Sequence, residues 1–175
     1  MPAATVQLPG SQIAGRIDPA LPNAVDEVAE AWVVVRPEKL LDVARFLRDE
    51  REIDARYLNA LSAVDRYDRF EIVYHLSSLS HNHVLTLKVR ADHESPEVPS
   101  VVSVWHGARL QEREAYDLMG IRFQDHPDLK RLFLWEGFPG HPLRKDFMSL
   151  PGGFKPGLQR FPKEDPGQWG GEFRA

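Results

Sequence analysis

The chain has 175 residues, of which 42% are hydrophobic, enough apolar surface for one domain of ordinary size with additional segments at its ends. A formal net charge of −4 and a pI near 6.0 argue against a nucleic-acid-binding protein, because such proteins normally present a net basic surface to phosphates. Without cysteine there is no disulfide framework and no thiolate for an iron–sulfur cluster, and no apolar run reaches the ~20 residues of a membrane span.

The N-terminal third predicts an arm followed by the start of a globular domain. Residues 1–25 contain several prolines and glycines without sustained periodicity, which predicts an extended N-terminal arm. The domain is expected over residues 26–147. Residues 31–35 are its first strand candidate, because their continuous apolar run is untypical of a solvated edge. Pro37 then opens a predicted helix that reaches about Asp49 and has apolar residues at helical spacing.

Three strands and a second helix are predicted next. Residues 57–64 form the first strand, and residues 70–76 and 85–89 alternate between apolar and polar side chains, which indicates an antiparallel meander with one buried face. Ser100 is the predicted N-cap of a helix that runs to about Met119 and stops at Gly120. This order predicts an α+β fold, with a mixed or antiparallel sheet and the helices packed on one face.

The composition changes from Glu136 onward. The last 40 residues contain 8 of the 12 glycines and 6 of the 14 prolines, so neither a helix nor a strand ladder continues there. Aromatic residues are spaced evenly through the same stretch, unlike a solvated linker. They are Phe138, Phe147, Phe154, Phe161, Trp169 and Phe173. These features predict a long irregular C-terminal tail, residues 148–175, that docks on another subunit. The alternative is a tail folded back on its own domain.

The second predicted helix carries carboxylates close to an apolar arc. Glu112 falls in the middle of this arc, so we predict that it is buried and paired with a cation, since an isolated buried charge is unfavourable by several kcal/mol. The candidate partners are Lys130, Arg131, Arg144 and Lys145. Of these, Arg131 and Arg144 are favoured. Glu114 and Asp117 are predicted to form a second acidic face on the opposite side. Two interpretations of Glu112 stay open: a proton relay with a raised pKa, or an anchor for the following loop.

The histidines allow a metal interpretation and a structural one. Those on the predicted meander, which suggest a metal site, are His75, His81, His83 and His93. However, no aspartate or glutamate completes a four-ligand set at a convincing spacing. His106, His126 and His141 lie among loop-forming residues and are predicted to be hydrogen-bonded structural residues. No glycine-rich dinucleotide loop or phosphate-binding loop is present, so the sequence does not support nucleotide binding.

The block from Glu112 to Phe147 resembles a known family. Its motifs are Glu112-Arg113-Glu114, Asp117-Leu118-Met119, His126 and Lys130-Arg131-Leu132-Phe133, followed by Trp135-Glu136-Gly137 and His141-Pro142-Leu143-Arg144-Lys145-Asp146-Phe147. They are similar to the signature of the 30-kDa subunit of respiratory complex I, the NADH-quinone oxidoreductase. The residues that this resemblance assigns to the signature and to docking are Glu112, Arg113, Glu114, Asp117, His126, Lys130, Arg131, Arg144, Lys145 and Asp146.

The resemblance implies a structural and assembly subunit of the peripheral arm of a proton-translocating NADH-quinone oxidoreductase. Such a chain would have no catalytic centre and no cofactor of its own, while FMN, iron–sulfur (Fe-S) clusters and quinone lie on partner subunits. It would form a hetero-oligomer with the 49-kDa subunit and the neighbouring iron–sulfur subunits, on the cytoplasmic face of the inner membrane or its organellar equivalent.

Two alternatives remain at this point. The same domain occurs in membrane-bound hydrogenases and in ferredoxin- or deazaflavin-fed dehydrogenases, so the chain is alternatively the equivalent subunit of one of those. The alternative from another class is a free-standing hydrolase that uses the three carboxylates Glu112, Glu114 and Asp117.

Overall fold

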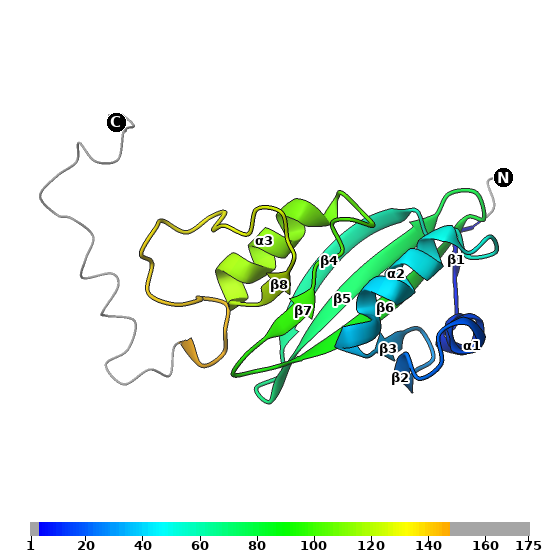
Figure 1. Ribbon diagram of the computed structural model, residues 1–175, viewed down its shortest axis with the longest axis horizontal. Helices are drawn as coiled ribbons and strands as arrows, with labels where there is room; N and C mark the ends of the chain where they lie inside the picture. The colour runs from blue at the N-terminus through cyan, green and yellow to red at the C-terminus, as the bar shows by residue number, and fades with distance from the viewer. Residues whose placement is uncertain (1–3, 148–175) are drawn as a thin grey trace, which may run out of the picture.

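A six-stranded mixed sheet forms the centre of the computed structural model, which describes residues 4–147 (Figure 1). The strands are β1 (Val6–Gln7), β2 (Val25–Val28), β3 (Val33–Val35), β4 (Tyr57–Asp65), β5 (Arg69–Ser78) and β6 (His83–Asp92). Their order is β2-β3-β6-β5-β4, and β1 also pairs with β6. The predicted meander is confirmed as the antiparallel ladder β4-β5-β6, whereas β1 and β3 join β6 in parallel.

One face of the central strands is fully buried, and most of the other face of β5 is buried as well. On β5 every second side chain from Phe70 to Leu76 is fully buried, and Leu85, Leu87 and Val89 of β6 point the same way. The side chains that alternate with them on β6 are partly exposed on the other face; they are Thr86, Lys88 and Arg90. Burial of these apolar side chains is the main favourable contribution to the fold.

The fully buried side chains of the sheet form one hydrophobic core together with side chains of three helices. These helices are α1 (Gly10–Ala20), α2 (Leu40–Asp49), which follows the 3-10 turn η1 (Pro37–Lys39), and α3 (Ala108–Met119). The fully buried side chains of α2 include Leu40 and Leu47, at the spacing that the sequence indicates. The prediction of an α+β fold with a mixed sheet and helices on one face is therefore confirmed.

The prediction of an extended N-terminal arm over residues 1–25 is wrong for its described part. Residues 10–20 form α1, and β1 adds to the sheet beside β6. Ile13 and Ile17 are fully buried in the common core. Their burial outweighs the low helix propensity of the surrounding glycines and Pro19, because tertiary packing supplies most of the stability of a short helix.

The second predicted helix begins later than expected. Residues 101–107 form turns, and α3 begins at Ala108 rather than after Ser100. Ser100 instead continues a small parallel pair formed by β7 (Glu97–Pro99) and β8 (Arg122–Gln124), since its backbone N–H donates to the Gln124 carbonyl at 2.8 Å. The predicted stop at Gly120 is confirmed. The predicted tail, residues 148–175, lies outside the described residues.

Candidate functional site

α3 lies beside β4 at one side of the sheet and carries the first half of the signature (Figure 1). The helix ends at Gly120, whose φ of 78° is in the left-handed region that favours glycine. A Cβ atom at Gly120 would lie 2.6 Å from the ring of His141. This close approach shows that the chain after α3 folds back against the end of the helix.

Glu112 is fully buried, as predicted, but it has no cationic partner among the described residues. Its Oε2 accepts a hydrogen bond from the Ser100 hydroxyl at 2.7 Å, and its Oε1 accepts one from the Val101 N–H at 2.8 Å. The prediction of an ion pair with Arg131 or Arg144 is wrong, because both guanidinium groups are bonded elsewhere. Burial raises the pKa of Glu112 to about 7, although the two hydrogen bonds oppose this rise.

Asp117 is also fully buried, whereas Glu114, its predicted companion on the second acidic face, is exposed. Its Oδ2 accepts the N–H groups of the three consecutive residues 132–134 at 2.9, 2.7 and 2.9 Å. The Arg131 guanidinium lies 3.2 Å from its Oδ1. Burial alone would raise the pKa of Asp117, but the three N–H donors and Arg131 outweigh burial and hold it below its ordinary value.

Three further signature residues fasten the loop after β8. Arg113 donates from Nε to the carbonyl of Lys130 at 3.0 Å and from a terminal nitrogen to the carbonyl of Arg131 at 2.9 Å. His126 accepts the Asp128 N–H at Nδ1 and donates from Nε2 to the carbonyl of Arg109, both at 3.0 Å. The Lys130 ammonium lies 2.8 Å from a carboxylate oxygen of Asp128. His126 is therefore a hydrogen-bonded structural residue, as predicted.

The segment that ends the signature is attached to both α3 and the sheet. His141 donates from Nδ1 to the carbonyl of Asp117 at 2.9 Å, so it is also a structural histidine. Burial and the nearby arginines lower its pKa, against a smaller opposite effect of this hydrogen bond. Arg144 donates to the carbonyl of His93 at 3.0 Å and pairs with Asp146 at 3.2 Å. The backbone N–H of Lys145 donates to the buried carboxylate of Asp65 at 2.9 Å.

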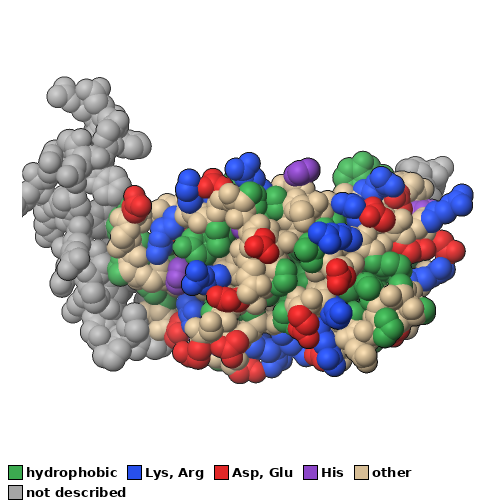
Figure 2. Space-filling model, viewed as in Figure 1, with side chains coloured by type: hydrophobic (Ala, Val, Ile, Leu, Met, Phe, Trp, Pro, Cys, Tyr) green, Lys and Arg blue, Asp and Glu red, His purple; other side chains and the backbone are tan. Residues whose placement is uncertain are grey.

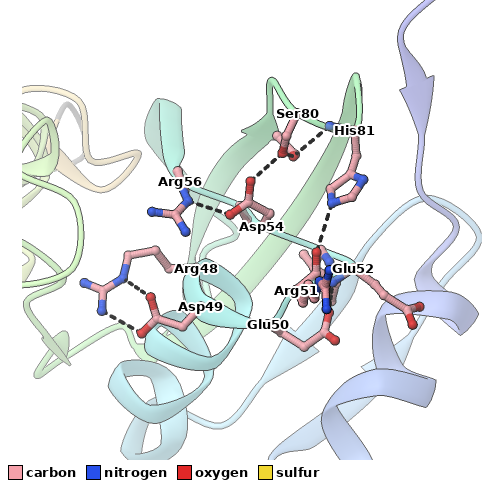
Figure 3. Close-up of polar contacts among 12 residues, drawn as sticks. Arg48, Asp49, Glu50, Arg51, Glu52, Asp54, Arg56, Ser80 and His81 are labelled. Atoms are coloured by element: carbon pink, nitrogen blue, oxygen red, sulfur yellow. Dashed lines mark hydrogen bonds and ion pairs between the residues drawn. The ribbon is translucent and has the colours of Figure 1, made fainter.

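The histidines on the meander bind protein groups rather than forming the metal set that their spacing suggested. His81 Nε2 donates to the carbonyl of Arg51 at 2.9 Å, and His83 Nε2 donates to the carbonyl of Ile53 at 2.7 Å. Figure 3 shows His81 pointing at Arg51, while Asp54 points toward Arg56 and a serine of the β5-β6 turn. These contacts fasten the connection between α2 and β4 to the β5-β6 turn.

One group of potential metal ligands occurs among residues 4–147, and the sequence did not suggest it. Ligand atoms of Asp65, His93 and Asp146 all lie within 4.8 Å of one another. However, the Arg144 guanidinium contacts both His93 and Asp146, and Asp65 accepts two backbone N–H groups. Arg144 is therefore the cation beside His93 and Asp146, while Asp65 contacts His93 at 3.3 Å as well as the two N–H groups, and these protein contacts explain the arrangement without a metal.

The three carboxylates of the hydrolase alternative do not converge on one point. Glu112 binds the chain that precedes α3, Asp117 binds the loop that follows it, and the exposed Glu114 has no hydrogen bond or ion pair among the described residues. A general acid and base pair needs both groups within reach of one substrate. The geometry gives no support to the hydrolase alternative.

Solved structures that resemble this fold include the following two. One is "Nqo5 of the trypsin-resistant fragment (1-134)", with a TM-score of 0.51 and 28% identity over 65% of this chain and 99% of that chain. The other is a chain of "the membrane-bound sulfane sulfur reductase (MBS), an archaeal respiratory membrane complex", with a TM-score of 0.64 and 24% identity over 81% of this chain and 86% of that chain. The fold is thus one that a component of a respiratory membrane complex adopts.

Sequence comparison identifies the family. The profile of "Respiratory-chain NADH dehydrogenase, 30 Kd subunit" matches residues 33–151. An NADH-quinone oxidoreductase subunit of Roseiflexus sp. (strain RS-1) is 44% identical over 146 residues, which cover 79% of this chain and 84% of the relative. The corresponding protein of Rhizobium etli is 44% identical over 135 residues, 75% of this chain and 71% of the relative. The chain belongs to the 30-kDa subunit family of respiratory complex I.

Proposed function

We propose that this chain is a cofactor-free structural subunit in the peripheral arm of a proton-translocating NADH-quinone oxidoreductase. It packs on the 49-kDa subunit and its iron–sulfur neighbours at the cytoplasmic face of the membrane. FMN, the clusters and quinone are carried by those partners, so this chain supports electron transfer through geometry alone. Among residues 4–147 no helix has the length and hydropathy to cross a membrane.

The observation that carries this proposal is that signature side chains bind the backbone of the loop that follows α3. Asp117 and Asp65 hold residues 131–147 through backbone N–H groups, and Arg113 and His141 add bonds to backbone carbonyls. These contacts occupy the polar atoms of the signature side chains and hold the loop against α3 and the sheet. A rigid loop of this kind is suited to docking, because little conformational freedom is lost on association.

The surface of this loop also favours a protein partner. The side chains of Phe133 and Leu143 are 64% and 54% exposed, although the Phe133 N–H donates to the buried Asp117 carboxylate and the Leu143 N–H donates to the Leu118 carbonyl. Large exposed apolar side chains on a rigid segment are typical of an interface. Figure 2 shows that acidic and basic side chains are interspersed on the visible face, without the continuous basic surface of a nucleic-acid-binding protein.

Exchange of one exposed aromatic residue tests the docking part of the proposal. Phe133→Ser is expected to reduce the amount of this chain that co-purifies with an affinity-tagged 49-kDa subunit, because it removes an apolar contact from the interface. Leu79→Ser is the matched control, since Leu79 is 70% exposed in the β5-β6 turn. Equal recovery of both variants with the tagged partner would contradict docking through this loop.

The proposal that this chain carries no cofactor is tested on the purified, isolated chain. We expect purified protein to show no flavin or cluster absorption in the visible range, no stoichiometric iron or zinc, and no oxidation of NADH. A chromophore or a metal bound at one equivalent would show that the chain is a redox carrier rather than a structural subunit.

A further inference from the structure

β4 is the outer strand of the described sheet, and part of its edge has free backbone groups. The Leu61 N–H points away from β5, because its acceptor is the side-chain oxygen of Gln111 on α3. The Arg66 N–H points toward β5 and donates to the Arg69 carbonyl at 2.9 Å. Since backbone direction alternates along a strand, Ala63 presents its N–H and C=O outward. Neither group has a hydrogen-bond partner among residues 4–147.

A groove of about 130 Å³ separates this edge from α3. Its apolar lining consists of Leu61, Ala63, Ala115, Leu118, Met119 and Leu143. An apolar cavity of roughly 150 Å³ holds a benzene molecule. The groove therefore has space for one aliphatic or aromatic side chain of a bound segment.

Glu114 lies at the rim of the same groove. Its side chain is exposed, and it has no ion pair or hydrogen bond among residues 4–147, unlike Glu112 and Asp117. An unpaired carboxylate beside an apolar groove is complementary to a lysine or arginine of a partner.

We propose that an extended segment of a partner subunit adds to β4 as a further strand at Ala63. One of its apolar side chains occupies the groove, and a lysine or arginine of the segment pairs with Glu114. Main-chain hydrogen bonds to a sheet edge supply affinity in such complexes, while the pockets for side chains select the sequence. This inference rests on the proposed function and adds to it the kind of segment that the partner supplies.

Removal of one backbone donor tests the added strand. Ala63→Pro removes the outward N–H and leaves the ladder to β5 intact, since proline is tolerated where the N–H faces away from the sheet. Ala63→Ser keeps the N–H and is the matched control. In complex isolated through a tag on the 49-kDa subunit, we expect retention of the proline variant to fall at least about tenfold, because the proline ring also blocks the approach of the segment.

A charge reversal at Glu114 tests the proposed ion pair with the partner segment. If the proline variant does not fold, this experiment by itself decides whether the proposal holds. Glu114→Lys is expected to lower retention several-fold at low salt, with a smaller effect at high salt because ions screen the pair. Glu30→Lys makes the same charge change at an exposed position far along the chain from the groove and is expected to have no effect. Retention of Glu114→Lys equal to that of Glu30→Lys at every salt concentration would overturn the proposal.

A photo-crosslinking residue in place of Glu114 identifies the occupant within the complex. The expected product joins this position to a peptide of a partner subunit that contains a lysine or arginine. A product that joins it to residues 148–175 of this chain or to a second copy would overturn the proposal. If the wild-type chain itself fails to associate with any subunit of an NADH-quinone oxidoreductase, the proposed function fails and the inference falls with it.

Discussion

Glu112 and Asp117 lie on the same helix, both fully buried, yet their electrostatic surroundings differ. Glu112 receives two hydrogen bonds from neutral donors, and burial raises its pKa to about 7. Asp117 receives three backbone N–H groups and a guanidinium, which outweigh burial and lower its pKa. The donors around a buried carboxylate, and not burial alone, therefore decide how strongly it holds its charge.

The largest expected effect comes from breaking the Asp117 side of this comparison. Asp117→Asn presents an amide nitrogen to groups that are themselves donors and leaves Arg131 without its anion, so we expect the free energy of unfolding to fall by roughly 3 to 5 kcal/mol. Urea denaturation of the purified chain measures this loss. Glu114→Gln is the control on the same helix and should stay within about 0.5 kcal/mol of wild type. Equal stability of the two variants would show that Asp117 does not organise the loop.

A smaller, pH-dependent effect is expected at Glu112. Its folded pKa of about 7 lies above the ordinary value of 4.5, so below pH 4.5 the group is protonated in both states and its stabilising contribution is complete. Between these values the folded state binds more protons than the unfolded state, and stability is lost as the pH rises through the folded pKa. The total change is roughly 3 kcal/mol between pH 4.5 and 7.5.

Glu112→Gln isolates this contribution, because all other titrating groups remain. The difference in unfolding free energy between wild type and variant should shift in favour of the variant by roughly 3 kcal/mol from pH 4.5 to 7.5. Denaturation curves at four or more pH values provide the measurement. Parallel pH profiles of the two proteins would indicate that Glu112 is ionised across this range, as expected for the ion pair that the structure lacks.

The smallest expected effect concerns the hydroxyl that binds Glu112. Ser100→Ala removes one buried hydrogen bond and should lower the unfolding free energy by about 1 kcal/mol, with a larger loss at pH 8 than at pH 5 because a bond to the ionised carboxylate is stronger. The exposed Ser103 provides the control variant Ser103→Ala. If the two serine variants had the same stability at both pH values, the Ser100 bond would contribute nothing measurable.

Local patterns in the sequence were sufficient for the elements that bury one regular face. The alternation from Phe70 to Leu76 and the apolar face of α2 predicted their structures, and the helical wheel placed Glu112 in the core. Gly120 marked the helix end because a left-handed position favours glycine.

The errors occurred where distant parts of the chain meet. A wheel assumes that a helix has one covered face, whereas residues 131–134 cover the other face and bury Asp117. The two hydrogen-bond donors to Glu112 are Val101 and Ser100, which lie eleven and twelve positions earlier, at the start of the segment that was predicted to be helical. The helix over residues 10–20 depends on packing against the strands beside it, which no local propensity records.

The parallel pairing of β1 with β6 has a consequence for the order in which the domain forms. β5 and β6 are joined by a short turn, so their ladder closes a small loop, whereas Val6 reaches its partner His83 across most of the domain. Closing a long loop loses more chain entropy before any contact compensates for it. The β5-β6 hairpin is therefore expected to form early in folding, and the N-terminal strand with its helix to attach last and to detach first in local opening.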